Sequence, residues 1–530
     1  MKGIILICFS IISLMFSFSL SAQTCEPWIE NMSIINGTIK RIDLTVNNIF
    51  NLEDAQENRL FHRVANKART KTQYFVVKRQ LLFVEGDQVD LKLLKESERI
   101  LRSRSYLKEA KIFPSLVCED GVVITVITKD NWSLQPGFGY GISSGQSKYS
   151  FEIQEKNLFG LGKSLEFKYK KGLERVEKSI KFSDTNWLGS SQKLFINYQS
   201  NSDGNLSHFN FQNPFVSLHT KNAWGINLFN RTLINSIYTA GEITNEIGQN
   251  IEQYTLSMGK LMSAEDDSYH RISWGITSDH SDFYNTELFP DAELPAERNY
   301  QYPWLAYEYL VENYIEKTNF NSMGRTEDIL LGHHLRAKLG QDVSQARTYF
   351  DVSYQKGHLL SKNNFISINA YSHGILDVDK FLNSHIGFTA KWHYFQNQSK
   401  TFYVSSNLDF GNQLYAEQPQ YLGGETGLRG YPFRYLAGTN KFITSIEQRF
   451  FHDWYPLKSF QFASVLFIDT GTVWGTGAER KLFSNIGVGL RLVPTRTAGG
   501  QIIHIDVGVP ITSAASLDNF QIQIKAKKSF

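Results

Sequence analysis

From residue 131 onward, most of the chain alternates apolar and polar side chains with a period of two. SLEFKYK sets Leu165, Phe167 and Tyr169 against polar neighbours, and NIGVGLRL (485–492) repeats the pattern. This period predicts β-strands with one apolar face and one polar face. About fifteen candidate strands precede residue 421, and five more follow residue 438, at roughly 441–451, 461–471, 483–493, 501–509 and 520–530.

Residues 34–130 show a different pattern, in which strand-like and helix-like segments are mixed. IDLTV (42–46) predicts a strand. DLKLLKESERILRSRSYL (90–107) places Leu94, Ser97 and Leu101 on one face at helical spacing, with Asp90 as the N-cap. KIFPSL and GVVITVITK then indicate two strands around a turn. The order β-α-α-β-β predicts one small α/β domain in front of the alternating region.

The first 22 residues have the pattern of a secretory signal peptide. Lys2 precedes an apolar run from Ile4 to Phe18, and small residues around Ala22 offer a cleavage site. The run is shorter than the about 20 residues that a membrane-spanning helix needs. We therefore expect residues 1–22 to direct export and to be removed.

The composition indicates where the exported strands reside. Only 20% of residues are charged, while 14% are aromatic. A closed barrel in lipid explains both, because each strand shows one face to lipid and closure leaves no unpaired edge. A soluble β-sandwich also alternates, but one of this length would normally divide into repeats, and no internal repeat is visible. We predict an all-β transmembrane barrel over residues 131–530.

The charge and the cysteine content limit which ligands and partners the protein is expected to bind. The net charge is only +3 and no dense basic patch is present, which argues against nucleic acid. Cys8 leaves with the signal peptide, whereas Cys25 and Cys118 remain in an oxidising compartment. They can form a structural disulfide or stay as free thiols, and the sequence leaves both alternatives open. Their spacing carries no metal signature, so we expect neither metal nor cofactor.

Candidate catalytic residues do not form a recognisable set. The chain has no phosphate loop and no zinc spacing. His333 and His334 are adjacent, so on a strand they point to opposite faces and cannot serve one metal. We expect that the protein is not an enzyme.

The most unusual segment is the glycine-rich stretch YLGGETGLRGYPFRYLAG (421–438), which carries Arg429 near its centre. Alternation in FITSIEQRF sends Glu447 to the polar face of one following strand, and alternation in VLFIDTG sends Asp469 to that of the next. If the loop folds back into the barrel, Arg429 can pair with both, because its planar fork matches carboxylate geometry. The alternative is an outward loop with a solvated Arg429.

Six segments of the chain resemble one family. Residues 76–112 resemble a POTRA domain, and NLFGLG (157–162) and TNWLGSS (185–191) resemble early-strand turns of the barrel-assembly superfamily that includes BamA, TamA and two-partner secretion transporters. FIDTGTVW (467–474) resembles one of its last strands. Its loop motif matches Gly423, Gly424, Leu428, Arg429, Gly430 and Tyr431, and its closing strand matches Phe520, Ile522, Ile524 and Phe530.

The resemblance implies a fold and a location. It implies a single POTRA-like domain (34–130) in the periplasm and a barrel (131–530) in the outer membrane of a Gram-negative cell. The superfamily barrel has about 16 strands, fewer than the about twenty candidates of our own count. The resemblance also implies that Arg429 lies inside the barrel, bonded to Glu447 and Asp469.

The resemblance further implies a function in handling polypeptides. It implies insertion or translocation of client outer-membrane or secreted polypeptides, through the barrel or at the seam between its first and last strands. Outer-membrane lipids and a periplasmic protein bound to the POTRA-like domain are further expected partners. The alternatives are a dedicated two-partner-type secretion transporter and a substrate-selective porin.

Overall fold

The computed structural model describes residues 25–28, 37–54, 58–68, 70–143, 146–218, 220–265, 267–323, 326–455, 460–475, 480–494, 502–513 and 517–527. The expected signal peptide and Phe530 lie outside the described residues. Among the described helices, none is long and apolar enough to cross a membrane.

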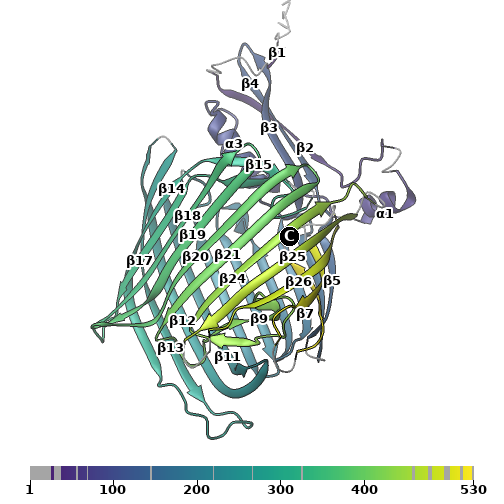
Figure 1. Ribbon diagram of the computed structural model, residues 1–530. Helices are drawn as coiled ribbons and strands as arrows, with labels where there is room; N and C mark the ends of the chain where they lie inside the picture. The colour runs from purple at the N-terminus through teal and green to yellow at the C-terminus, as the bar shows by residue number, and fades with distance from the viewer. Residues whose placement is uncertain are drawn as a thin grey trace, which may run out of the picture.

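A small α/β domain lies at one end of the molecule (Figure 1). Its sheet has the order β1-β3-β4-β2, in which only the β2–β4 pair is parallel. The elements are β1 Cys25–Pro27, β2 Ile39–Asn47, α1 Leu60–Ala68, α2 Tyr74–Lys78, α3 Leu91–Arg102, β3 Leu107–Cys118 and β4 Gly121–Asp130.

The core of this domain lies between the sheet and helices α2 and α3. Val77, Leu101 and Ile124 are fully buried in it. The predicted N-cap of α3 is confirmed, because an Asp90 carboxylate oxygen accepts from the backbone N–H of Lys92 at 2.8 Å. Helix α2 was not predicted, since five residues are too few to show a helical period.

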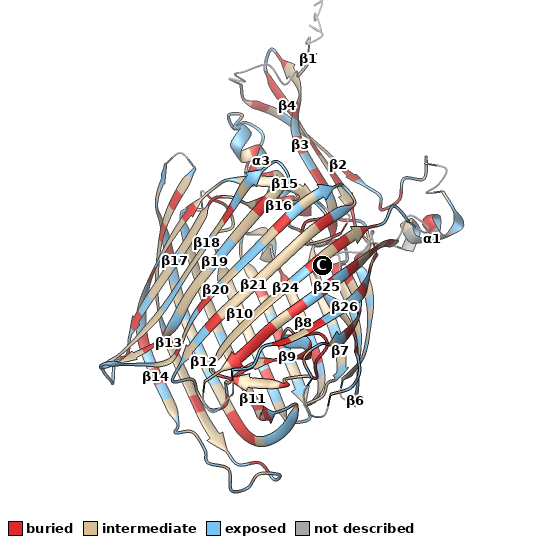
Figure 2. Ribbon diagram, viewed as in Figure 1, coloured by how far each residue is buried: buried red, intermediate tan, exposed pale blue. Residues whose placement is uncertain are grey.

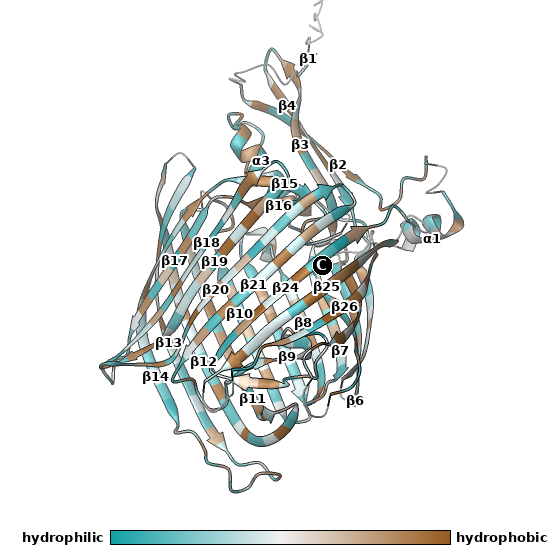
Figure 3. Cartoon of the chain, in the orientation of Figure 1, coloured by the Kyte–Doolittle hydropathy of each residue, from teal (hydrophilic) through white to brown (hydrophobic). Residues whose placement is uncertain are grey.

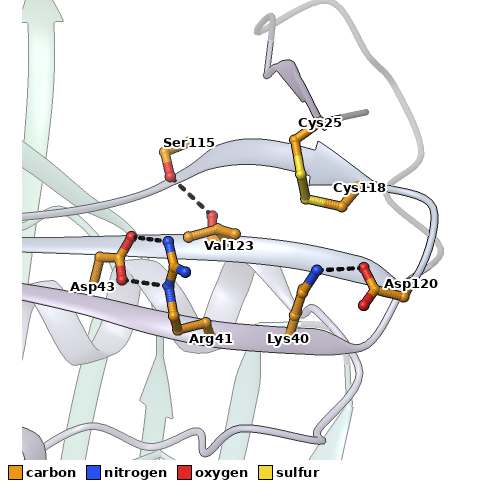
Figure 4. Close-up of a disulfide and its surroundings, with 8 residues drawn as sticks. All are labelled: Cys25, Lys40, Arg41, Asp43, Ser115, Cys118, Asp120 and Val123. Atoms are coloured by element: carbon orange, nitrogen blue, oxygen red, sulfur yellow. Dashed lines mark hydrogen bonds and ion pairs between the residues drawn. A yellow bond between two sulfur atoms is a disulfide. The ribbon is translucent and has the colours of Figure 1, made fainter. Parts of the chain in front are cut away.

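The sheet takes in a segment upstream of the predicted boundary at residue 34. Cys25 on β1 lies opposite Cys118 on β3, and the two form a disulfide (Figure 4). The disulfide therefore ties the start of the described chain to this domain. At the other boundary, the sheet ends at Asp130 and the first barrel strand starts at Leu134.

Within the described ranges, twenty antiparallel strands form a closed barrel (Figure 1). They are β5 Leu134–Ser143, β6 Gln146–Leu158, β7 Lys163–Lys171, β8 Val176–Asp184, β9 Lys193–Asn201, β10 Gly204–Asn213, β11 Asn222–Thr239, β12 Glu242–Glu265, β13 Ser268–Tyr284, β14 Arg298–Val311, β17 His333–Gln341, β18 Arg347–Ser361, β19 Asn364–Asp377, β20 Lys380–Asn397, β21 Lys400–Asn412, β24 Asn440–Phe451, β25 Phe460–Trp474, β26 Phe483–Pro494, β27 Ile502–Pro510 and β28 Gln521–Lys527.

The expectation of about 16 strands, taken from the resemblance, is wrong for this chain. Fifteen of the described barrel strands precede the glycine-rich stretch and five follow it, as the alternation pattern predicted. The pattern was the better guide because each strand that crosses the bilayer must show its own alternation, whatever the barrel size of a relative.

The two faces of the barrel wall differ as the alternation requires (Figures 2 and 3). On β25, Leu466 and Ile468 are exposed on the outer surface, whereas Val465, Phe467 and Asp469 are buried on the inner one. The outer face can therefore contact lipid, while polar and charged groups gather in the lumen.

Two insertions between barrel strands enter the lumen. The arginine loop, residues 413–439 between β21 and β24, contains β22 Gln420–Leu422, the short helix η3 Gly424–Thr426 and β23 Leu436–Gly438. The luminal hairpin, between β14 and β17, consists of β15 Tyr314–Thr318, β16 Thr326–Leu330 and the tip residues 319–323. The hairpin lies at the barrel end nearest the small domain, here called the domain end, and the arginine loop belongs to the far end (Figure 1).

Candidate functional site

The arginine loop folds into the barrel, and Arg429 is buried against the luminal wall. Its Nε and Nη2 donate to the two carboxylate oxygens of Asp469 at 2.8 and 2.7 Å. Its Nη1 donates to Glu447 at 2.9 Å. The structure thus brings Arg429 together with the two carboxylates that alternation placed on the polar faces of neighbouring strands. The guanidinium is buried and not solvated.

Two polar side chains complete the surroundings of Asp469. Ser445 and Asn485 lie directly opposite Asp469 on the two neighbouring strands. Ser445 Oγ donates to one Asp469 oxygen at 2.7 Å, and Asn485 Nδ2 donates to the other at 3.0 Å. Sequence reasoning missed both residues, because alternation gives the face of a residue but not the register that sets it opposite another strand.

Charge in this network is nearly balanced. Arg449 donates through Nε to the second Glu447 oxygen at 2.8 Å, so two arginines face two carboxylates. The Arg429 guanidinium also lies 3.5 Å from the centroid of the Phe467 ring. Burial alone would lower the pKa of Arg429, but Asp469 and Glu447 outweigh it and raise that pKa above its ordinary value. Arg429 is therefore a permanent cation that requires its partners.

The glycines of the motif allow the loop backbone to touch the wall. A Cβ on Gly430 would lie 2.7 Å from the Cβ of Asn485, and a Cβ on Gly508 would lie 2.9 Å from the Gly430 nitrogen. Gly423 has φ +131°, a conformation that L side chains rarely adopt. Close approach at Gly430 and Gly508 is what allows the adjacent arginine to reach two carboxylates.

The aromatic residue of the motif fixes the loop from its other side. Tyr431 is 0% exposed and packs edge-on against Phe483, with ring centroids 5.5 Å apart. Its hydroxyl lies 2.9 Å from the carbonyl oxygens of Ser484 and Thr512. Leu428 is also fully buried. The motif residues therefore form one buried contact surface on β24–β27 and the turn that follows β27.

The loop reaches strands on both sides of the barrel seam, where β28 neighbours β5. Gln523 on β28 donates to the Arg429 carbonyl oxygen at 3.2 Å. Glu425 forms an ion pair with Lys148 on β6, one strand beyond β5. Farther along the wall, Arg434 contacts Glu174 of the β7–β8 turn and the Ser236 carbonyl of β11. The loop is thus an internal brace across the seam.

The first strand of the seam is poorly suited to strong pairing. β5, LQPGFGYGIS, includes Pro136, which has no N–H to donate, and three glycines. Of the predicted closing-strand residues, Phe520 and Ile522 are exposed on the lipid side, Ile524 is half-buried and Phe530 lies beyond the described range.

The two early-strand turns join the barrel to the small domain. Asn157 of NLFGLG donates through Nδ2 to Thr72 Oγ1 at 2.8 Å, and Thr72 Oγ1 donates to Asp130 at 2.7 Å. A Cβ on Gly162 would lie 3.0 Å from the Tyr106 hydroxyl, and one on Gly189 of TNWLGSS would lie 2.7 Å from the Arg79 guanidinium. These turns therefore form the joint between domain and barrel.

In the part of the chain that the structure describes, no group of three or more His, Cys, Asp and Glu side chains could hold a metal ion. His333 contacts the Tyr354 hydroxyl at 2.7 Å, and His334 contacts Glu308 at 2.9 Å. The two histidines therefore have separate partners.

Comparison with known proteins yields one curated relative in sequence. Outer membrane protein assembly factor BamA of Buchnera aphidicola subsp. Acyrthosiphon pisum (strain APS) is 26% identical over an aligned length of 237 residues, and the match covers 41% of this chain and 36% of that protein. The chain thus matches about a third of the length of that relative. No family model matches. Over the matched part, the chain is similar in sequence to a member of the barrel-assembly superfamily.

Solved structures of the superfamily resemble the chain over most of its length. BamA from Haemophilus ducreyi lacking POTRA domains 1–3 is 12% identical with a TM-score of 0.40, and covers 94% of this chain and 88% of its own. CdiB from Escherichia coli is 11% identical with a TM-score of 0.46, and covers 95% and 80%.

Proposed function

We propose that this protein inserts or translocates client polypeptides at the seam of its barrel. The observation that supports this most directly is the weak seam itself. β28 meets a β5 that contains one proline and three glycines, and an internal loop braces the two sides. A barrel that only had to stay closed would gain from a first strand without proline and glycine.

The driving force for insertion is the cost of unpaired backbone in lipid. An unsatisfied N–H or C=O in the hydrocarbon region costs several kcal/mol, so a client strand gains free energy by pairing with an opened β5 or β28 edge. No bond has to be made or broken in such a step. We accordingly propose a non-enzymatic role.

The small domain is proposed to lie in the periplasm as the single POTRA-like unit of the chain. β2 is an edge strand of its sheet, and extended polypeptides commonly bind by adding a strand to such an edge. The joint of Asn157, Thr72 and Asp130 would hold a captured client next to the barrel mouth.

A dedicated secretion transporter is the alternative role within the same superfamily. One observation favours it: twenty strands enclose a wider lumen than sixteen, because barrel diameter grows with strand number, and the lumen contains an element at each end that a client in transit would have to displace. A substrate-selective porin is less favoured, because solute conduction needs neither the small domain nor the brace at the seam.

Depletion of the protein tests these roles directly. Outer-membrane and culture-supernatant fractions would be compared by quantitative proteomics before and after depletion. Loss of several unrelated barrel proteins from the outer membrane supports insertion. Loss of one or two large secreted chains with an unchanged outer membrane supports dedicated secretion. If neither fraction changes while uptake of a small solute falls, the proposal is wrong and the porin role is favoured.

A further inference from the structure

The luminal hairpin packs against a distant part of the barrel wall. Its base joins β14 and β17, but its tip residue Met323 is buried in a cluster with Phe451, Ala463, Val493 and Ile502 on β24 to β27. Those wall residues face the lumen, since Ala463 shares the inner face of β25 with Asp469. The hairpin therefore crosses the lumen at the domain end, from β14 and β17 to the wall formed by β24 to β27.

The tip is a defined structure that is sealed by apolar contacts. The Phe320 ring stacks on His393 of β20 with centroids 4.2 Å apart, and it meets Phe365 of β19 edge-on. The Glu327 carboxylate accepts from the backbone N–H groups of Asn321 and Ser322 at 2.8 and 3.0 Å. The tip is thus shaped to fit the wall on which it lies.

The hairpin itself contains a destabilising pair. Glu316 on β15 lies directly opposite Asp328 on β16. Two like charges at opposed positions of a strand pair repel each other, so this hairpin is weakened unless a cation lies between them.

Helix α3 of the small domain supplies that cation. The Arg102 guanidinium contacts Asp328 through Nη2 at 2.6 Å and through Nε at 3.2 Å, and it contacts Glu316 at 2.9 Å. Arg99, one turn earlier on α3, lies over the ring of Tyr314 at 5.0 Å. The hairpin is thus held in place by an element of another domain.

We propose that the luminal hairpin is a latched cover over the luminal wall of β24 to β27, and that α3 holds the latch through Arg102. When the small domain moves away from the barrel mouth, Glu316 and Asp328 lose their shared cation, and the hairpin loosens and uncovers the wall. This regulates access to the barrel interior from the domain end, and as a control of client entry it rests on the proposed function.

Ala463 provides a direct readout of the cover. It is fully buried beneath the hairpin tip, and cysteine is only slightly larger. Cys25 and Cys118 are joined in the disulfide, so an Ala463→Cys variant offers one new thiol in the described mature chain. The rate at which a bulky maleimide labels this thiol, in full-length protein in lipid nanodiscs, measures how often the wall is uncovered.

Four backgrounds of the Ala463→Cys protein separate the cover from the latch. Deletion of residues 314–330, with a short Gly/Ser linker, should give the fastest labelling. Arg102→Ala should raise the rate several-fold over the parent, and Arg102→Lys should give an intermediate rate, because it keeps the charge and loses the two-point contact. Lys92→Ala is the matched control, since Lys92 on the same helix pairs with Asp267 of the β12–β13 turn.

Each outcome bears on one part of the proposal. Equal labelling of the parent and the deletion variant shows that the hairpin covers nothing, and overturns the proposal. Fast labelling of the deletion variant with equal rates for Arg102→Ala and Lys92→Ala overturns the latch. No client is present in this assay, so the cover and latch can succeed even where depletion refutes a role in polypeptide insertion.

Discussion

The arginine loop and the luminal hairpin both enter the lumen, but the contacts that hold them differ in kind. Arg429 is bound by carboxylates from two adjacent strands of one sheet, and Asp469 is 2% exposed. The hairpin carboxylates are bound by an arginine of a separate domain, and their side chains are 17% exposed at Asp328 and 58% exposed at Glu316. The loop is therefore part of the folded barrel, whereas the hairpin depends on how the small domain is docked.

The free energy that each ion pair contributes depends on how deeply the pair is buried. Removing one partner of a buried ion pair costs about 3–5 kcal/mol, because the remaining charge is stranded. In the hairpin only the Arg102–Asp328 pair is mostly buried, whereas Glu316 is exposed, and an exposed pair contributes about 0–1 kcal/mol. We expect substitutions in the loop network to be more destabilising than substitutions at the hairpin.

Arg429→Ala should have the largest effect. It leaves Asp469 and Glu447 without their shared partner, and should weaken docking of the loop by about 3–5 kcal/mol. The barrel should still form, since its strand ladders do not include Arg429. Protease sensitivity and amide hydrogen exchange of residues 413–439 should both rise, and heat-modifiable migration on gels should report an intact barrel.

Arg429→Lys is the matched control for that prediction. Lysine keeps the charge but cannot donate to both Asp469 oxygens as a planar fork, so we expect an intermediate exchange rate. Wild-type exchange in Arg429→Ala would mean that apolar packing of Leu428 and Tyr431 alone holds the loop. The comparison with the hairpin would then fail.

Tyr431→Phe should have a smaller effect in the same loop. The ring stays buried against Phe483, while the hydroxyl that contacts the Ser484 and Thr512 carbonyl oxygens is lost. Loss of one neutral hydrogen bond costs about 0.5–1.5 kcal/mol. Hydrogen exchange at residues 428–436 should therefore increase less than in Arg429→Ala. An equal increase would place the main anchor at the tyrosine.

Much of the barrel and its arginine site could be predicted because both depend on local alternation. The period of two placed Glu447 and Asp469 on the luminal face of neighbouring strands, and it gave the strand number better than the resemblance did. The partners Ser445 and Asn485 could not be predicted, since they follow from register, which no single strand encodes.

The luminal hairpin lay outside the reach of sequence reasoning for a different reason. β15 and β16 have five residues each, too few to distinguish a short barrel strand from an insertion. Its direction depends on contacts between residues far apart in the chain, such as Phe320 with His393 and Arg102 with Asp328. Those contacts exist only after the barrel has closed and the small domain has docked.

Acid should weaken the seam brace through Glu425. Burial opposes ionisation of this carboxyl, but the charge and hydrogen bond of Lys148 outweigh it and hold the pKa of Glu425 below its ordinary value near 4.5. Because the folded-state pKa is the lower one, this contribution is present above about pH 4.5 and is lost as the pH falls through the folded value.

The contribution of Glu425 is expected to be modest, about 0–1 kcal/mol, because its side chain is partly exposed. Hydrogen exchange of residues 423–427 should accelerate, beyond the intrinsic pH dependence, on going from pH 5 to pH 3. Lys148→Met should abolish that additional acceleration. If the variant and the wild type respond alike, the brace does not depend on this pair.

The smallest expected effect is the coupling between the two insertions. Their arginines have different partners, yet both insertions lie on the same wall: Arg429 binds Asp469 of β25, and Met323 covers Ala463 of the same strand. A hydrogen-bonded strand transmits little strain, so the effects of Arg429→Ala and Arg102→Ala should add within about 0.5 kcal/mol.

Hydrogen exchange of the loop and maleimide labelling at Ala463→Cys, measured in the two single variants and the double variant, give this coupling. Additivity means that the far end and the domain end open independently. A larger coupling means that release of the hairpin also loosens the loop, and that docking of the small domain controls the seam through β25.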